Sequence, residues 1–332
     1  MLFLSTLISG LLVTISSNSW LGAWMGLEIN LLSFIPLMSN NDNMFTTEAS
    51  LKYFLIQALA SAALLFIIIS KSLVETLYSI TSSYLTNFVV LTPLLLKSGA
   101  APLHWWFPSV MEGLSWNNCF ILMTMQKIAP LTLISYMISI NWFLTIMILA
   151  SVTIGAIGGY NQTSIRKILT YSSINHMGWM LTAMLMGETM WMLYFLIYSI
   201  LTLTVISIII PSQISFINQT FLMNNENKIM KILLFMSLLS LGGLPPFLGF
   251  LPKWMIIQFM ILNWSFVIIS IMVILSLITL YYYLRITYSA FIILSSEPSW
   301  NYIWKNSKFL ALFLSTLSMM SLLISTLLIN IY

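Results

Sequence analysis

Charged side chains are scarce in this chain. Only 6% of its 332 residues are Asp, Glu, Lys or Arg, whereas soluble domains carry about 25%. Hydrophobic residues make up 60%, and the mean hydropathy is +0.99. The basic residues behind the net charge of +4 are scattered singly, which excludes the basic stripe of a nucleic-acid-binding protein. The composition therefore predicts an integral membrane protein.

Cysteine and histidine are also few. The single cysteine, Cys119, excludes an internal disulfide and a thiolate cluster, and two histidines make no obvious metal set. The sequence contains no Walker A loop, no GxGxxG and no HExxH motif. We therefore expect no metal, iron–sulfur cluster or nucleotide cofactor to be bound by this chain itself.

Long apolar segments separated by short polar breaks fill most of the chain. A span needs about 20 apolar residues, so the pattern predicts an all-α fold of about eleven transmembrane helices. The N-terminal stretch MLFLSTLISGLLVTI lacks the features of a secretory signal or a transit peptide. We interpret it as the first helix of a single polytopic domain over residues 1–332.

Two of the apolar segments are interrupted. In the segment 91–108, Lys97 is followed by Gly99 and Pro102, and the segment 229–262 is broken by GGLPP before Lys253. Paired broken helices in corresponding positions are typical of transporters built from inverted repeats. The spacing predicts two inverted five-helix repeats, about 1–138 and 142–288, and a C-terminal helix over about 309–330.

Four charged residues fall inside predicted helices: Glu28, Lys97, Lys127 and Lys253. A lysine in the centre of a bilayer costs about 2.5–3.5 kcal/mol on insertion scales, so it is rarely kept without a use. We predict that Glu28 pairs with Lys97, because charges about 4 Å apart interact by about 4 kcal/mol at an effective dielectric of 20. That energy exceeds the roughly 2.3 kcal/mol needed to move a charge through 100 mV. The four residues are therefore the predicted proton-translocation site.

Several of these residues have a plainer interpretation. Lys97 lies near a break, from which its side chain can snorkel to the membrane interface. His104 and His176 are candidates for a proton relay, but a lone histidine is more often a packing or interfacial group. Trp105 and its aromatic neighbours are typical of an interfacial belt. A scaffold whose charges only support helix packing also stays open.

Basic residues outside the spans predict the topology, because short loops on the cytosol-like side are rich in Lys and Arg. With the N-terminus on that side, Lys71 alone falls opposite. The following residues fall on the N-terminal side: Lys52, Arg166, Lys167, Lys228, Lys231, Arg285, Lys305 and Lys308. The remaining three basic residues are the three lysines inside helices.

Seven stretches carry a resemblance to a known family: WMGLEIN, TTEASLKYFL, LLLKSGAAPLHWWFP, MQKIAPL, GGYNQTSIRKILTYSSINHMGWM, SLGGLPPFLGFLPKW and YYYLRITYSAF. Together they resemble subunit 2 of mitochondrial NADH:ubiquinone oxidoreductase, respiratory complex I, in an arthropod-like version. This subunit family is similar to cation/proton antiporters. Its key glutamate matches Glu28, and its key lysines match Lys97, Lys127 and Lys253.

The resemblance implies a core membrane-arm subunit that couples NADH-to-ubiquinone electron transfer, in other subunits, to proton translocation. NADH, FMN, iron–sulfur clusters and ubiquinone would then be bound elsewhere in the complex. It also implies the mitochondrial inner membrane, neighbouring antiporter-like subunits as partners, contact with phospholipids such as cardiolipin, and an N-terminus on the matrix side. Bacterial members carry three further N-terminal helices, and this chain begins at the counterpart of their fourth. The alternative function is a stand-alone cation/proton antiporter.

Overall fold

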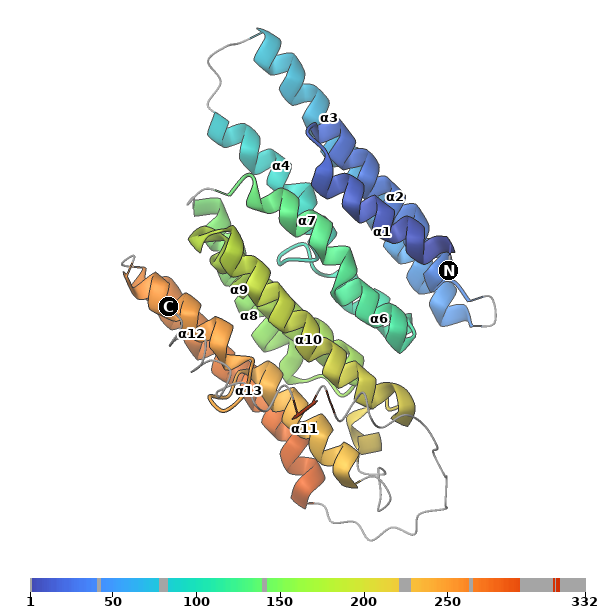
Figure 1. Cartoon of the computed structure of the whole chain (residues 1–332), viewed down its shortest axis with the longest axis vertical. Helices are drawn as coiled ribbons and strands as arrows, with labels where there is room; N and C mark the ends of the chain where they lie inside the picture. The colour runs from blue at the N-terminus through green and yellow to red at the C-terminus, as the bar shows by residue number, and fades with distance from the viewer. Residues whose placement is uncertain are drawn as a thin grey trace. The chain divides into compact units, whose positions relative to one another are not determined.

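The computed structural model of the chain describes residues 2–40, 43–77, 83–138, 142–220, 228–262, 265–292, 313 and 315–316. Within these ranges the regular elements are helices, apart from one isolated bridge between Ser164 and Phe216 (Figure 1). The helices group into two compact units, Met1–Met147 and Ile148–Tyr332. The all-helical fold predicted from the sequence is thus confirmed for the described residues.

The first unit is built around the long helix α3. This helix packs against α2, α4 and α5, while α7 packs against α4, α6 and α1. The bounds are α1 (Leu2–Ser16), α2 (Trp20–Met38), α3 (Met44–Leu77), α4 (Ser83–Ser98), α5 (Trp106–Gly113), α6 (Trp116–Met123) and α7 (Met125–Ser135). Helix α8 (Trp142–Tyr160) begins in this unit and ends in the second.

Small residues allow α1 and α2 to lie very close together. A Cβ atom added at Gly26 would lie 2.5 Å from Thr14 Cγ2 and 2.8 Å from the Thr14 backbone nitrogen, and one at Gly10 would lie 3.0 Å from the Asn30 nitrogen. Lipid gives apolar side chains little reason to leave it, so helices in membranes associate largely through such close packing. This contact fixes α2, which carries Glu28 and Asn30.

The second unit surrounds helix α9, whose side chains are buried on almost every side. Its neighbours include α10 and α12, and α11 packs against α10 and α13. The remaining bounds are α9 (Ile165–Met186), α10 (Glu188–Ser212), the 3-10 turn η1 (Ile217–Thr220), α11 (Lys228–Gly242), α12 (Phe250–Leu262) and α13 (Phe266–Ile292).

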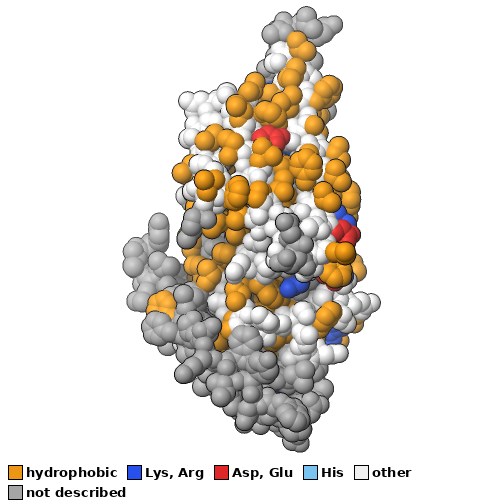
Figure 2. Space-filling view, turned by 90° about the vertical axis from the view of Figure 1, so that its right-hand side faces the viewer, with side chains coloured by type: hydrophobic (Ala, Val, Ile, Leu, Met, Phe, Trp, Pro, Cys, Tyr) orange, Lys and Arg blue, Asp and Glu red, His pale blue; other side chains and the backbone are white. Residues whose placement is uncertain are grey.

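Five described helices are long and apolar enough to cross a membrane: Trp20–Met38, Met44–Leu73, Trp142–Tyr160, Glu188–Ser212 and Phe266–Tyr288. Helix α9 has sufficient length, but residues such as Ser172, Asn175 and His176 make it too polar to face lipid. Its burial explains how this polarity is tolerated. Figure 2 shows one face of the molecule, where hydrophobic side chains are widespread and charged ones sparse.

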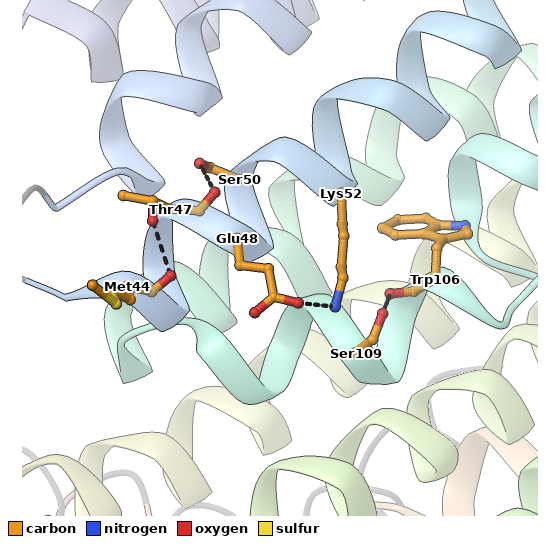
Figure 3. Close-up of polar contacts among 7 residues, drawn as sticks. All are labelled: Met44, Thr47, Glu48, Ser50, Lys52, Trp106 and Ser109. Atoms are coloured by element: carbon orange, nitrogen blue, oxygen red, sulfur yellow. Dashed lines mark hydrogen bonds and ion pairs between the residues drawn. The ribbon is translucent and has the colours of Figure 1, made fainter.

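Several predicted boundaries were wrong. Helix α3 runs from Met44 to Leu77, so Lys52 and Lys71, which we counted outside the spans, lie within a helix. Glu48 pairs with Lys52 at 2.6 Å, one turn along the half-exposed surface of α3 (Figure 3). The predicted C-terminal helix over about 309–330 lies outside the described residues except for positions 313 and 315–316. The count of eleven spans and the inverted repeats stay predictions.

Candidate functional site

The first interrupted segment stops α4 with a recognisable backbone motif. Gly99 has a φ of +74°, which an L-amino acid with a side chain rarely adopts. The Gly99 N–H donates to Leu96 O at 3.2 Å, and the Ala100 N–H donates to Leu95 O at 3.1 Å. These are the two bonds of a Schellman motif. The chain then turns through residues 99–105 before α5 begins at Trp106.

The second interrupted segment ends α11 in the same way. Gly243 has a φ of +84°. The Gly243 N–H donates to Ser240 O at 3.1 Å, and the Leu244 N–H reaches Leu239 O at 3.5 Å. Both breaks are therefore formed by one glycine at the same position of the same motif, and each leaves helix-end carbonyl groups inside the protein.

A lysine accompanies each of these helix ends. Lys97 belongs to the last turn of α4, and only 7% of it is exposed. Lys253 belongs to α12, but its Nζ reaches back and donates to Gly242 O at 2.9 Å, at the end of α11. The C-terminus of a helix carries a partial negative charge that favours a cation. Both breaks thus offer an electrostatic reason for a buried lysine.

The end of α4 does not use the ammonium group of Lys97 for its carbonyl groups. Trp106 Nε1 donates to Leu96 O at 3.1 Å, and Gln57 Nε2 donates to Lys97 O at 3.3 Å. Neutral donors therefore bind the carbonyl groups at the end of α4, whereas the Lys253 ammonium binds the carbonyl group at the end of α11. Lys97 also lines a pocket whose wall holds both polar and apolar residues.

This pocket lies within the first unit and has room for ordered water. Lys97 and Lys127 both line it, which brings two of the predicted site residues to one cavity. Its other lining residues are Leu27, Asn30, Leu31, Tyr53, Gln57, Ser98, Trp106, Phe107, Leu122, Gln126 and Pro130.

Lys127 is positioned by a helix break that the sequence did not predict. Helices α6 and α7 are divided at Thr124, whose Oγ1 donates to Phe120 O at 2.7 Å. Pro130 lies inside the continuous helix α7. Lys127 follows the break within one turn, is 2% exposed, and places its Nζ 4.9 Å from the ring centroid of Phe107.

Glu28 lies on α2 with its side chain half-buried. No ion pair within 4.0 Å joins Glu28 and Lys97, two described residues, so their charged groups are not in direct contact. The separation of about 4 Å that we assumed from the sequence is therefore too short for this structure.

The two histidines differ in their surroundings. His176 is buried in α9, with Nδ1 2.8 Å from the hydroxyl of Tyr194 and the ring of Tyr198 next to it. His104 lies between α4 and α5 and is partly exposed. Its Nδ1 is 3.1 Å from Pro102 O, and since a carbonyl only accepts, Nδ1 carries the hydrogen.

The uncharged polar residues of the pocket were not predicted from the sequence. Asn30, Gln57 and Gln126 carry amide groups inside apolar helices. Tyr53 is a buried aromatic residue that brings a hydroxyl group to the same pocket. An amide in a membrane span is costly unless bonded, so its mid-helix position was a usable signal. Of the residues that line the pocket, only the charged ones were predicted as site residues.

The comparisons with known proteins agree with one another. Residues 17–279 match the family described as NADH:quinone oxidoreductase/Mrp antiporter, TM. NADH-ubiquinone oxidoreductase chain 2 of Anopheles gambiae is 56% identical over 90% of this chain and 88% of its own, and that of Aedes aegypti is 53% identical over 98% and 96%.

Among solved structures, a chain of respiratory complex I from Thermus thermophilus has a TM-score of 0.84 at 22% identity, over 98% of this chain and 78% of its own. A chain of the Mrp complex from a Dietzia species has a TM-score of 0.75 at 18% identity, over 86% and 59%. These likenesses show a shared fold, and the sequence matches show the family. The chain belongs to the NADH:quinone oxidoreductase/Mrp antiporter transmembrane family, among the relatives named NADH-ubiquinone oxidoreductase chain 2.

Proposed function

We propose that this chain is a core membrane-arm subunit of respiratory complex I, which couples NADH-to-ubiquinone electron transfer to proton translocation. The observation that carries the proposal is the name shared by relatives that are 45–56% identical over at least 90% of the chain, NADH-ubiquinone oxidoreductase chain 2. Two buried lysines beside one pocket support a proton-handling role for the chain itself.

In the proposed mechanism, electron transfer elsewhere changes the electric field along the buried charges. Glu28 then modulates the protonation of Lys97, and a proton passes between Lys97 and Lys127 through their shared pocket. At the second break, Lys253 belongs to the path along which protons are exchanged. His176, with its hydroxyl partner, and His104 are proposed relay members.

Electron carriers belong to other subunits in this proposal, because one cysteine and two histidines give this chain few ligands for them. NADH, FMN, iron–sulfur clusters and ubiquinone would be bound there. The proposed location is the mitochondrial inner membrane, with the N-terminus on the matrix side. Proposed partners are the neighbouring antiporter-like subunits and phospholipids such as cardiolipin.

Purification from mitochondrial inner membranes tests the proposal. An affinity-tagged chain is expected to co-purify with rotenone-sensitive or otherwise quinone-linked NADH oxidation, and its loss is expected to abolish that activity. A chain that purifies alone and exchanges cations for protons in vesicles would contradict the proposal. That outcome would favour the alternative, a stand-alone antiporter. The observation behind this alternative is the fold that the chain shares with a chain of an Mrp complex.

A further inference from the structure

Three uncharged side chains form a hydrogen-bonded chain along the wall of the pocket that Lys97 and Lys127 line. The hydroxyl of Tyr53 donates to Gln126 Oε1 at 3.3 Å, and Gln126 Nε2 donates to Asn30 Oδ1 at 2.9 Å. The three residues come from α3, α7 and α2. Gln126 is therefore the middle member of a polar chain that joins three helices.

The amide of Gln126 has bonding capacity beyond this chain. An amide has two N–H donors and two acceptor lone pairs on its oxygen. Among the described residues, one donor is used by Asn30 and one lone pair by Tyr53. One N–H and one lone pair thus remain on a side chain that lines the pocket. A water molecule in the pocket can therefore accept a hydrogen bond from the Gln126 amide and donate one to it.

The bonds also fix the direction in which the amide points. Tyr53 is held in place by edge contacts with Phe34 at 5.3 Å and with Trp106 at 6.0 Å between ring centroids. The Tyr53 hydroxyl donates to the Gln126 oxygen, and the Gln126 nitrogen donates to Asn30. Leaving a partly buried amide unbonded is costly, and these two bonds hold the Gln126 amide at the pocket.

Proton transfer between two amines needs such orientation. A donor and an acceptor must lie within about 2.6–3.2 Å of each other or be joined by a water molecule. In the proton transfer proposed above, the ammonium of Lys97 would give a proton to water, and that water would give a proton to a neutral Lys127 amine. The transfer is fast only when the hydrogens of the water point along the route.

We propose that Gln126, held by Tyr53 and Asn30, is a positioning residue that orients the pocket water through which a proton passes between Lys97 and Lys127. The amide itself neither gains nor loses a proton. The inference rests on the proposed function and adds to it a residue that carries no charge.

The test compares Gln126→Met with Gln258→Met in the assembled complex, reconstituted in vesicles. Methionine has a length similar to that of glutamine but lacks the donor and the strong acceptor. We expect Gln126→Met to slow NADH-driven turnover about tenfold, which corresponds to the loss of one hydrogen bond between Gln126 and the water that carries the proton. The ratio of rates in H₂O and D₂O should also rise, because proton transfer becomes limiting. Gln258 is exposed on α12, so Gln258→Met should behave as wild type.

Wild-type turnover and an unchanged isotope effect in Gln126→Met would overturn the inference, as would an equal loss in Gln258→Met. If Gln126→Met fails to assemble, Tyr53→Phe removes one hydroxyl and keeps the ring contacts. A higher isotope effect there supports the inference, and an unchanged one overturns it. Lys127→Met separates the two proposals. Full pumping in Lys127→Met would refute the proposed proton transfer between Lys97 and Lys127, whereas its loss beside a normal Gln126→Met refutes only the role of Gln126.

Discussion

At the scale of single residues, the two lysines at the helix breaks have different surroundings. The ammonium of Lys253 is bound to Gly242 O, whereas the carbonyl groups at the end of α4 are bound by Gln57 and Trp106. Lys97 is therefore buried beside a pocket without serving as a cap. This arrangement suits a group that changes its protonation state, because no backbone group depends on its charge.

The surroundings of Lys97 predict how stability and function separate. A buried charge without an ion pair within 4.0 Å is costly, so Lys97→Met should leave the melting temperature of the assembled complex unchanged or raise it. A scaffold role predicts the opposite, a loss of about 3 kcal/mol or more, as when a buried pair is broken. Thermal unfolding of the complex, followed by fluorescence, distinguishes the two.

Gly243 has a backbone conformation that favours glycine. Its φ of +84° disfavours any side chain, and an added Cβ would lie 3.0 Å from Lys253 Nζ. Gly243→Ala should therefore destabilise the second unit by about 1–2 kcal/mol from backbone strain alone.

Gly242→Ala is the matched control, because a Cβ there would meet its nearest atom, in Tyr283, at an ordinary 3.4 Å. Melting temperatures of the two variants measure the difference. Equal melting temperatures would contradict the role assigned to Gly243.

At the scale of elements, close helix contacts are the feature with the clearest consequence. A Cβ at Gly26 would overlap Thr14, including its backbone. Gly26→Ala should push α1 from α2 and destabilise the unit by about 1–3 kcal/mol, the usual range for overpacking. Gly22→Ala should cost less, since the nearest atoms there are serine side-chain atoms at 3.2 Å. Limited proteolysis of the complex at increasing temperature compares them, and equal sensitivity would argue against the close contact.

The sequence predicted some elements well and others poorly, for physical reasons. The breaks after Lys97 and before Lys253 were predictable because glycine and proline mark them. The break at Thr124 was not, because threonine is common inside helices and its hydroxyl bond to Phe120 O appears only in the fold. The first turns of α3 were not predicted, because Glu48 looks like a loop residue until its i,i+4 pairing with Lys52 on one helix face is seen.

At the scale of the whole molecule, each compact unit contains one interrupted helix with the same backbone motif and an accompanying lysine. The charged members of the candidate site could be predicted from the sequence, since charge in an apolar helix is conspicuous. The pocket that joins Lys97 and Lys127 could not, because it depends on helices that are distant in sequence. The same holds for the amide chain through Gln126.

The central claim is that the proton route runs through Lys97 and is driven by electron transfer in the rest of the complex. The most direct measurement is the number of protons translocated per NADH oxidised in vesicles that contain the assembled Lys97→Ala complex. Lys52→Ala serves as the control, because Lys52 lies half-exposed on α3. We expect Lys97→Ala to lower the proton yield or to stall turnover, and Lys52→Ala to do neither. A wild-type proton yield at wild-type turnover in Lys97→Ala would contradict it.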